Sequence, residues 1–210
     1  MSRLVLVGDS VFDNAAYVTG PDVRTQVETK MPAGWSVSLL AVDGSFIMDV
    51  PSQLHQLPDD AKLVVVSAGG NDVLRQADLL GNPVGSVGQA LLLLEGAVSQ
   101  FRAVYGQLLE AVLATEVKSY LCTIYRPNLP DAELQRITST ALGLFNDVIV
   151  EEAAHRRLPI LDIRAIFTDS RDYANLIEPS VEGGTKLAEA IVGLASHSGS
   201  GPYRDSVIVS

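Results

Sequence analysis

Short runs of continuous hydrophobic residues recur along the chain, and the segments between them are long enough to form helices. Such runs are typical of parallel strands, because a parallel sheet is covered on both faces and its strands do not alternate between polar and apolar positions. The pattern predicts five strands in a mostly parallel sheet, at residues 4–7, 37–42, 63–67, 120–125 and 160–163.

Between these runs, apolar residues recur at spacings of three and four, which is the period of an amphipathic helix. One stripe covers residues 94–112, and another covers 187–194 after Pro179. Strands that alternate with helices predict a doubly wound, three-layer α/β/α domain with a flavodoxin-like outline. A further stripe predicts that one helix buries Leu134, Ile137, Ala141, Leu144 and Val148.

The chain is predicted to form one domain over residues 1–197, followed by a C-terminal tail over 198–210. Residues 197–202 are small and polar, as in loosely held tails, although the apolar run 207–209 could dock on the domain. With 210 residues, of which 47% are hydrophobic, the chain can bury one core of substantial size.

Composition and charge exclude several classes of protein. The sequence contains no run of about 20 apolar residues, which a membrane span would require. Its N-terminus lacks the apolar region of a signal peptide, so we expect a cytoplasmic protein. A net charge of −10 repels a phosphate backbone and makes nucleic acid a poor partner. The single cysteine, Cys122, lies in an apolar run and is expected to be a buried thiol.

Glycines beside small polar residues follow the first three predicted strands. In an open α/β sheet, functional groups gather at the carboxyl ends of the strands, and glycine lets backbone N–H groups approach a ligand closely. The three segments are Gly8-Asp9-Ser10, Asp43-Gly44-Ser45 and Ala68-Gly69-Gly70-Asn71-Asp72.

These segments offer the groups that acyl transfer requires. Ser10 begins a turn and is placed as a nucleophile, while the N–H groups of Ser10 and Gly44 and the side-chain amide of Asn71 could bind a developing oxyanion. Taken singly, each residue is also an ordinary turn former, so the order of the three segments carries the functional interpretation.

That order resembles the SGNH/GDSL hydrolase family, whose first three sequence blocks carry a serine, a glycine and an asparagine. The family's later block also has a counterpart in residues 175–184, where Pro179-Ser180 and Gly183-Gly184 are similar to family members. The resemblance implies an SGNH-hydrolase fold and a serine esterase, lipase or acetylhydrolase that acts on small-molecule esters. It also implies that Ser10 is the nucleophile and that Ser10, Gly44 and Asn71 bind the oxyanion.

The chain departs from the family at the general base. Asn175 and Glu178 stand where the family has the Asp and His of its Asp-x-x-His block. Glu178 is therefore our candidate base, although a glutamate pKa of about 4.3 suits this role only if burial raises it. The alternative is that Glu178 is a solvated carboxylate near the N-terminus of the last helix, with no catalytic role.

None of the three histidines is expected near the site. The topology places His55 and His155 at the ends of helices that lead to the amino edge of the sheet. His197 ends the last predicted helix, about 24 Å from its start for about 16 residues. A histidine elsewhere in the chain therefore does not replace the family's base.

A mostly acidic set of side chains accompanies the candidate site. We expect these residues to cap turns and form ion pairs. No fixed ligand spacing supports a metal ion, and no cofactor is expected. An arginine of the set could orient an anionic substrate or pair with Glu178, and pairing would lower the glutamate pKa. The set is Asp9, Asp13, Asp43, Asp72, Arg126, Asp162 and Arg164.

Three functions are compatible with these observations. The first is a hydrolase of small acyl esters with a non-histidine base. The second is a non-catalytic or nearly inactive domain that keeps the pocket to bind a small ligand, which the loss of both His and Asp favours. The third is a nucleotide or flavin binder, which is disfavoured because no Gly-x-Gly-x-x-Gly or Walker pattern opens a helix. We rank the hydrolase first.

Overall fold

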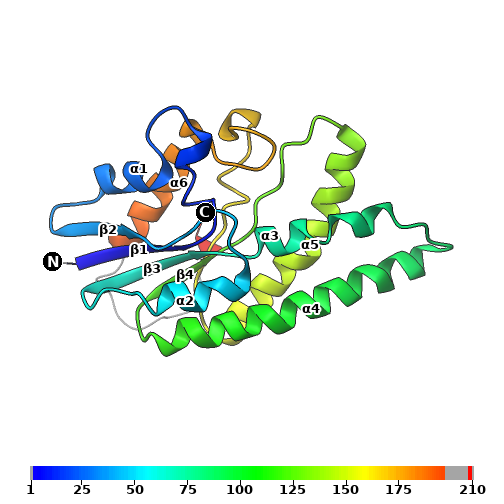
Figure 1. Ribbon diagram of the computed structural model, residues 1–210, viewed down its shortest axis with the longest axis horizontal. Helices are drawn as coiled ribbons and strands as arrows, with labels where there is room; N and C mark the ends of the chain where they lie inside the picture. The colour runs from blue at the N-terminus through cyan, green and yellow to red at the C-terminus, as the bar shows by residue number, and fades with distance from the viewer. Residues whose placement is uncertain (1, 197–207, 210) are drawn as a thin grey trace.

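The computed structural model describes residues 2–196 and 208–209. A six-stranded, wholly parallel sheet forms its middle layer, with the strand order β2-β1-β3-β4-β5-β6 (Figure 1). The α/β fold and the five predicted strands are confirmed, and a short sixth strand is added beside β5. The strands are β1 (Ser2–Gly8), β2 (Trp35–Leu39), β3 (Ala61–Ser67), β4 (Ser119–Cys122), β5 (Ile160–Leu161) and β6 (Ile208–Val209).

Three strands end earlier than the hydrophobic runs predicted. After β2, the N–H groups of Leu40 and Ala41 both donate to the carbonyl of Leu6, so the regular ladder stops there. After β4, the side chain of Asn146 bonds both the N–H and the C=O of Ile124, each at 2.8 Å. An asparagine side chain thus replaces a neighbouring strand, and the chain turns away from the sheet at this point.

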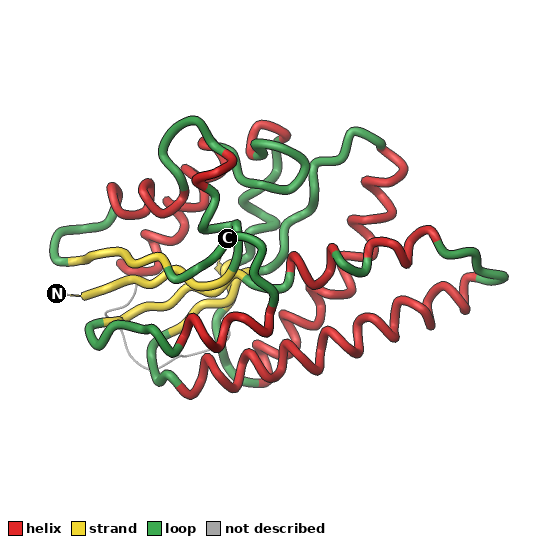
Figure 2. Tube along the Cα trace, viewed as in Figure 1, coloured by secondary structure: helices red, strands yellow, loops and turns green. Residues whose placement is uncertain are grey.

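Helices cover both faces of the sheet (Figures 1 and 2). A hydrophobic core lies on each face of the sheet, and alternate residues of β1 point into the two cores. Val5 and Val7 pack in one core, and Leu4 and Leu6 pack in the other. One face carries α1 (Val23–Lys30) and α6 (Val181–Ser196). The other carries α2 (Val50–Leu54), α4 (Val87–Ala114) and α5 (Ala132–His155).

The predicted stripe of α6 is buried, and that of α4 is buried from Phe101 to Val112 but only half-buried at Leu94 and Val98. The predicted stripe of α5 is wrong in part. Leu134, Ile137 and Leu144 are between 39% and 46% exposed. The helix instead buries Leu142 and Phe145 together with Val148, Ile149 and the polar Asn146. The first turns of α5 reach beyond the sheet, so apolar residues there have no layer to cover.

Five short helical segments complete the described chain. No helix within residues 2–196 is both long and apolar enough to cross a membrane. The predicted domain boundary at residue 197 lies outside the described residues. The short segments are α3 (Gly70–Leu74), η1 (Ala15–Tyr17), η2 (Ile47–Asp49), η3 (Ala77–Gly81) and η4 (Ser170–Asp172).

Candidate active site

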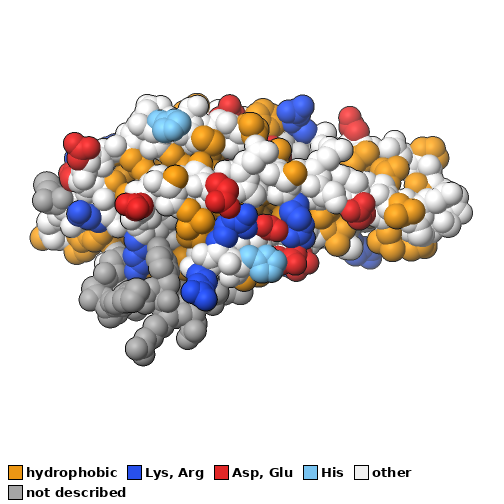
Figure 3. Space-filling view, turned by 90° about the horizontal axis from the view of Figure 1, so that it is seen from below, with side chains coloured by type: hydrophobic (Ala, Val, Ile, Leu, Met, Phe, Trp, Pro, Cys, Tyr) orange, Lys and Arg blue, Asp and Glu red, His pale blue; other side chains and the backbone are white. Residues whose placement is uncertain are grey.

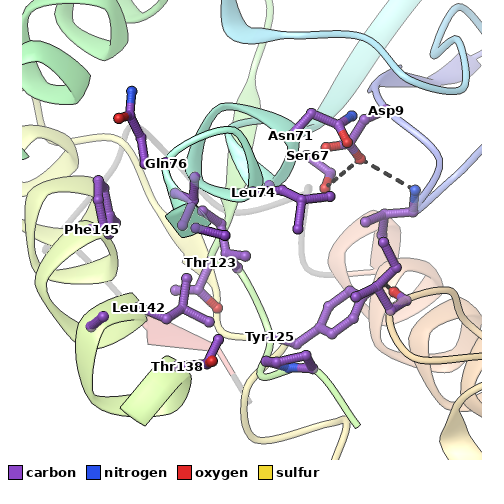
Figure 4. Close-up of a pocket in the computed structure, with 18 of the residues that line it drawn as sticks. Asp9, Ser67, Asn71, Leu74, Gln76, Thr123, Tyr125, Thr138, Leu142 and Phe145 are labelled. Atoms are coloured by element: carbon purple, nitrogen blue, oxygen red, sulfur yellow. Dashed lines mark hydrogen bonds between the residues drawn. The ribbon is translucent and has the colours of Figure 1, made fainter. Parts of the chain in front are cut away.

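The segments that follow β1, β2 and β3 meet at the carboxyl edge of the sheet. The Ser67 hydroxyl donates to Asp9 Oδ1 at 3.2 Å, a contact that Figure 4 marks. The amide of Asn71 donates to the carbonyl of Ser45 at 2.9 Å. The N–H of Ile47 in turn donates to Asp72 at 2.9 Å, so hydrogen bonds tie the second and third segments together.

Gly8 is required by close backbone packing at the end of β1. Its φ is +129°, and a Cβ at this position would lie 1.7 Å from the carbonyl oxygen of Ser67. The side chain of Gln53 accepts from the Gly8 N–H at 2.7 Å and donates to the Gly8 carbonyl at 2.9 Å. This buried amide holds the turn that leads to Ser10, a role that the sequence pattern did not indicate.

Ser10 and Glu178 are in direct contact, although 168 positions separate them in the chain. The Ser10 hydroxyl donates to Glu178 Oε1 at 3.1 Å. Ser10 is 9% exposed and Glu178 is 5% exposed, so the hydrogen bond is largely shielded from solvent. Glu178 is therefore not the solvated carboxylate that the alternative interpretation required.

The surroundings of Glu178 favour its protonated form. Burial raises the pKa of the carboxyl group, the hydrogen bond from Ser10 opposes that rise, and the negative charge of Asp43 adds to it, with a net increase. Its second oxygen, Oε2, is buried and has no hydrogen-bond partner among the described residues. A carboxylate with one unpaired oxygen holds a proton more readily than a solvated carboxylate does.

A network of hydrogen bonds fixes the loop that carries Glu178. Asn175 Oδ1 accepts from the N–H groups of Ile177 and Glu178, both at 2.9 Å. The Tyr125 hydroxyl donates to the carbonyl of Ile177, and the Asn14 amide donates to the carbonyl of Pro179 at 3.0 Å. Asn175 thus caps the turn and positions the backbone, and it bonds the backbone of Glu178 rather than its carboxylate.

The proposed oxyanion donors do not all line the same cavity. Ser10, Asn71 and Glu178 line it together, whereas Gly44 is exposed on the loop after β2 and is not among the lining residues. Gly44 has a φ of +76°, a left-handed conformation that favours glycine. Asn71 uses one amide hydrogen for Ser45, which leaves the second hydrogen available to a ligand.

Asp9 is a second buried carboxyl group beside Ser10. It is 3% exposed, and its Oδ1 accepts from the N–H of Val11 and from the Ser67 hydroxyl, both at 3.2 Å. Burial raises the pKa of Asp9 to about 7, and the charge of Glu178 contributes to the increase. The sequence predicted a turn-capping role, which is confirmed, but it did not indicate this burial.

Asp13 and Asp43 join two separate segments of the chain, so the turn-capping role predicted for them is wrong. Asp13 accepts from the N–H of Asp43 at 2.9 Å, and Asp43 accepts from the Tyr17 hydroxyl at 2.8 Å. The latter hydrogen bond raises the pKa of Tyr17 to about 12. These contacts hold the loop after β2 against the segment after β1.

Arg164 follows the ion pairing expected for this set, and the possible pairing with Glu178 does not occur. This residue instead forms an ion pair with Asp162 at 2.6 Å. Arg126 is exposed, and within the described residues it forms no ion pair with Glu178. No arginine charge therefore offsets the burial of the Glu178 carboxyl group among the described residues.

The two described histidines lie away from Ser10, as predicted. His55 follows α2 and borders a hollow that includes Ala61, the first residue of β3, so it lies at the amino edge of the sheet. His155 is the last residue of α5. The predicted position of His197 lies outside the described residues.

The described residues contain no group of three His, Cys, Asp or Glu side chains that could hold a metal ion. Cys122 is a free, buried thiol, as predicted, and burial raises its pKa. Its ionised form is therefore disfavoured, which excludes it as a ready nucleophile at neutral pH.

Solved structures share this fold at low sequence identity. An extracellular lipase from Streptomyces rimosus has a TM-score of 0.67 at 15% identity, over 93% of this chain and 99% of the lipase. A lipase/acylhydrolase from Enterococcus faecalis has a TM-score of 0.67 at 20% identity, over 98% and 100%. An acetyl xylan esterase from Geobacillus stearothermophilus has a TM-score of 0.61 at 20% identity, over 97% of each chain.

The curated protein sequences contain no match to this chain. A family pattern does match it, and that pattern is described as the GDSL-like Lipase/Acylhydrolase family. The match covers residues 6–183, which is well over half of the chain and includes Ser10, Asn71 and Glu178. The chain therefore belongs to the GDSL-like lipase/acylhydrolase family of hydrolytic enzymes.

Proposed function

We propose that the protein hydrolyses carboxylic esters with Ser10 as the nucleophile and Glu178 as the general base. The observation that carries the proposal is the buried hydrogen bond of 3.1 Å from Ser10 Oγ to Glu178 Oε1. A nucleophile within hydrogen-bond reach of a base is the minimum geometry for this chemistry. The raised pKa of Glu178 supports the assignment, because a base works best when its pKa approaches the working pH.

The first half-reaction transfers the acyl group to Ser10. As Ser10 Oγ attacks the carbonyl carbon, its proton moves to Glu178 Oε1. The carbonyl oxygen becomes an oxyanion, which the N–H group of Ser10 and the free amide hydrogen of Asn71 stabilise. When the tetrahedral intermediate collapses, Glu178 gives its proton to the leaving oxygen, and the alcohol departs.

The second half-reaction hydrolyses the acyl-enzyme. Glu178, again a carboxylate, takes a proton from a water molecule that attacks the ester carbon. Collapse of the second tetrahedral intermediate breaks the bond to Ser10 Oγ, which recovers a proton from Glu178, and the acid is released. We expect slow turnover, because removal of the histidine from a serine protease triad costs about 10⁶ in kcat.

A second candidate is a domain that binds a small ligand without chemistry. No histidine lines the cavity among the described residues, which favours binding without catalysis. Ligand affinity would then hardly depend on the Ser10 hydroxyl, which would contribute at most one modest hydrogen bond.

Ester hydrolysis by the wild type, Ser10→Ala and Glu178→Gln separates these candidates. The hydrolase proposal predicts turnover that Ser10→Ala removes and Glu178→Gln strongly reduces. Equal rates in all three proteins would reject the proposal. The cytoplasmic location and the preference for small acyl groups stay predictions, and one relative of similar fold is an extracellular lipase.

A further inference from the structure

The cavity that begins at Ser10 continues into a part of the molecule that the catalytic proposal does not use. Figure 4 shows Asp9, Ser67 and Asn71 at one end, and Leu142 and Phe145 of α5 at the other. Between these ends, α3, η3, α4 and α5 each contribute side chains to the lining. The contributed side chains include Val73, Leu74, Leu79, Leu80, Leu94 and Ala141.

The two ends of the cavity differ in polarity. Polar and ionisable groups surround Ser10, whereas the far end has no charged lining residue. The hydroxyl of Thr123, which lies along the wall, donates to Asp162 at 2.8 Å and is therefore already satisfied. Gln76 and Thr138 add two uncharged polar side chains to the far part of the lining. A charged ligand group there would lose its hydration without an opposite charge to compensate, whereas a hydrocarbon would gain from burial against the apolar side chains.

The size and shape of the cavity restrict the hydrocarbon. Its volume is about 140 Å³. An engineered apolar cavity of about 150 Å³ in another protein holds a benzene ring, so the available space corresponds to about six carbon atoms. Along α5 the lining extends from Thr138 to Phe145, which is about 10 Å at 1.5 Å per residue. Six carbons spread over this length form a straight chain rather than a ring.

The reaction geometry assigns this space to the acyl half of the ester. The leaving alcohol must receive its proton from Glu178, so it departs on the side of Glu178. That side also holds Tyr125, which donates to the carbonyl next to Glu178 and lies away from Leu142 and Phe145 in Figure 4. The acyl chain therefore extends toward the far end of the cavity, at Leu142 and Phe145 of α5.

We propose that this cavity is an acyl-chain site and that the preferred substrates are esters of unbranched acids with about six carbons. The inference rests on the proposed hydrolase function. It departs from the sequence-based expectation of small acyl groups, because an acetyl group would leave the apolar walls of α3, η3 and α5 without contact.

The experiment measures kcat/KM for p-nitrophenyl acetate, butyrate, hexanoate and octanoate below their micelle concentrations. Each buried CH₂ should raise kcat/KM about three- to fourfold, until the increase stops near hexanoate. The variant Ala141→Phe places a ring in the far part of the cavity and should lower the hexanoate-to-acetate ratio about tenfold or more, the effect of two to three buried CH₂ groups.

Ala154→Phe is the matched control, because Ala154 is exposed on the same helix and does not line the cavity. This variant should keep the profile of the wild type. Leu74→Trp offers a second way to narrow the cavity if Ala141→Phe does not fold. Leu74 is 53% exposed at the wall of the cavity, so its replacement does not disturb the core.

The possible failures are distinguishable. Serine-dependent activity that is highest on acetate, or an unchanged profile in both narrowing variants, overturns the acyl-chain site and leaves the hydrolase proposal in place. If no ester is hydrolysed, the proposed function fails. Calorimetric binding of hexanoate then tests whether the cavity holds a six-carbon chain. Binding by wild type and Ala154→Phe, with loss in Ala141→Phe, would support it, and no binding by wild type would overturn it.

Discussion

At the Ser10 end of the cavity, hydrogen bonds hold each functional group, whereas mostly apolar side chains form the wall near α5. Gln53, Asn14 and Asn175 each bond backbone groups of the segments that carry Ser10 and Glu178. Directional bonds of this kind fix a geometry closely, as a reaction requires. Apolar walls specify mainly volume, so they can be altered with less effect on the chemistry.

The contrast extends to the surface next to the cavity. The segment from Leu79 to Leu94 contains no charged residue, although the net charge of the chain is −10. Leu91 and Leu92, in the first turns of α4, are 57% and 71% exposed. Figure 3 shows hydrophobic side chains gathered at the end of the molecule where these turns lie. The wall of the proposed acyl-chain site thus lies next to an exposed apolar surface at the first turns of α4.

The largest expected effect is on the proposed chemistry. Glu178→Gln keeps the shape of the side chain and removes its ability to accept the Ser10 proton, so kcat should fall by about 10²–10⁴. The wild-type rate should rise with pH through the raised pKa of Glu178, because only the carboxylate form acts as a base. Steady-state kinetics from pH 4 to 9 tests both points, and a variant rate that equals wild type would remove Glu178 from the mechanism.

The next effect concerns stability at the same end of the cavity. The pKa of Asp9 is raised from 3.8 to about 7, so the folded state binds more protons than the unfolded state between these values. Protonated Asp9 therefore contributes to the free energy of unfolding, and this contribution is complete below pH 4. It is lost as pH rises through 7, so the free energy of unfolding falls by up to about 4 kcal/mol.

Asp9→Asn keeps an oxygen for Val11 and Ser67 but does not titrate, so it should flatten this pH dependence. Urea unfolding at pH 4 to 8 measures the difference. Parallel curves for wild type and variant would show that Asp9 does not titrate in this range.

A smaller loss of stability is expected when the clamp on Gly8 is removed. Gln53→Leu leaves the buried N–H and C=O of Gly8 without their side-chain partner, which should lower the unfolding free energy by about 1–3 kcal/mol. Gln56→Leu is the control, because the Gln56 amide donates only to the exposed carbonyl of Ser52 in the preceding helix α2. If thermal unfolding gives equal losses for both variants, the clamp has no special role.

The smallest effect is expected at the apolar end of the molecule. Leu92→Ser replaces a side chain that is 71% exposed, so the unfolding free energy should change by no more than about 0.5 kcal/mol. A change above 2 kcal/mol in urea unfolding would show that this surface is packed in solution, and the contrast between the two ends would then be weaker.

The sequence predicted the sheet because continuous hydrophobic runs depend only on local composition. The sequence also predicted that Ser10, Asn71 and Glu178 lie at the carboxyl edge of the sheet, because each follows or faces the end of a parallel strand. It did not reveal that Gln53 clamps Gly8 or that Asp9 is buried, since these facts depend on contacts between segments 45 and 58 positions apart. The buried face of α5 was assigned wrongly in part, because apolar residues repeat on two faces of that helix and only Val148 of the predicted stripe is fully buried.

Covalent trapping tests the Ser10–Glu178 pair most directly. Intact-mass spectrometry would follow the reaction of a hexyl fluorophosphonate with wild type, Ser10→Ala and Glu178→Gln at several pH values. We expect a single adduct on Ser10 whose rate rises with pH through the raised pKa of Glu178, a rate about 10²-fold lower in Glu178→Gln, and no adduct in Ser10→Ala. An adduct on another residue, or equal labelling rates in wild type and Glu178→Gln, would contradict the assignment of this nucleophile and base.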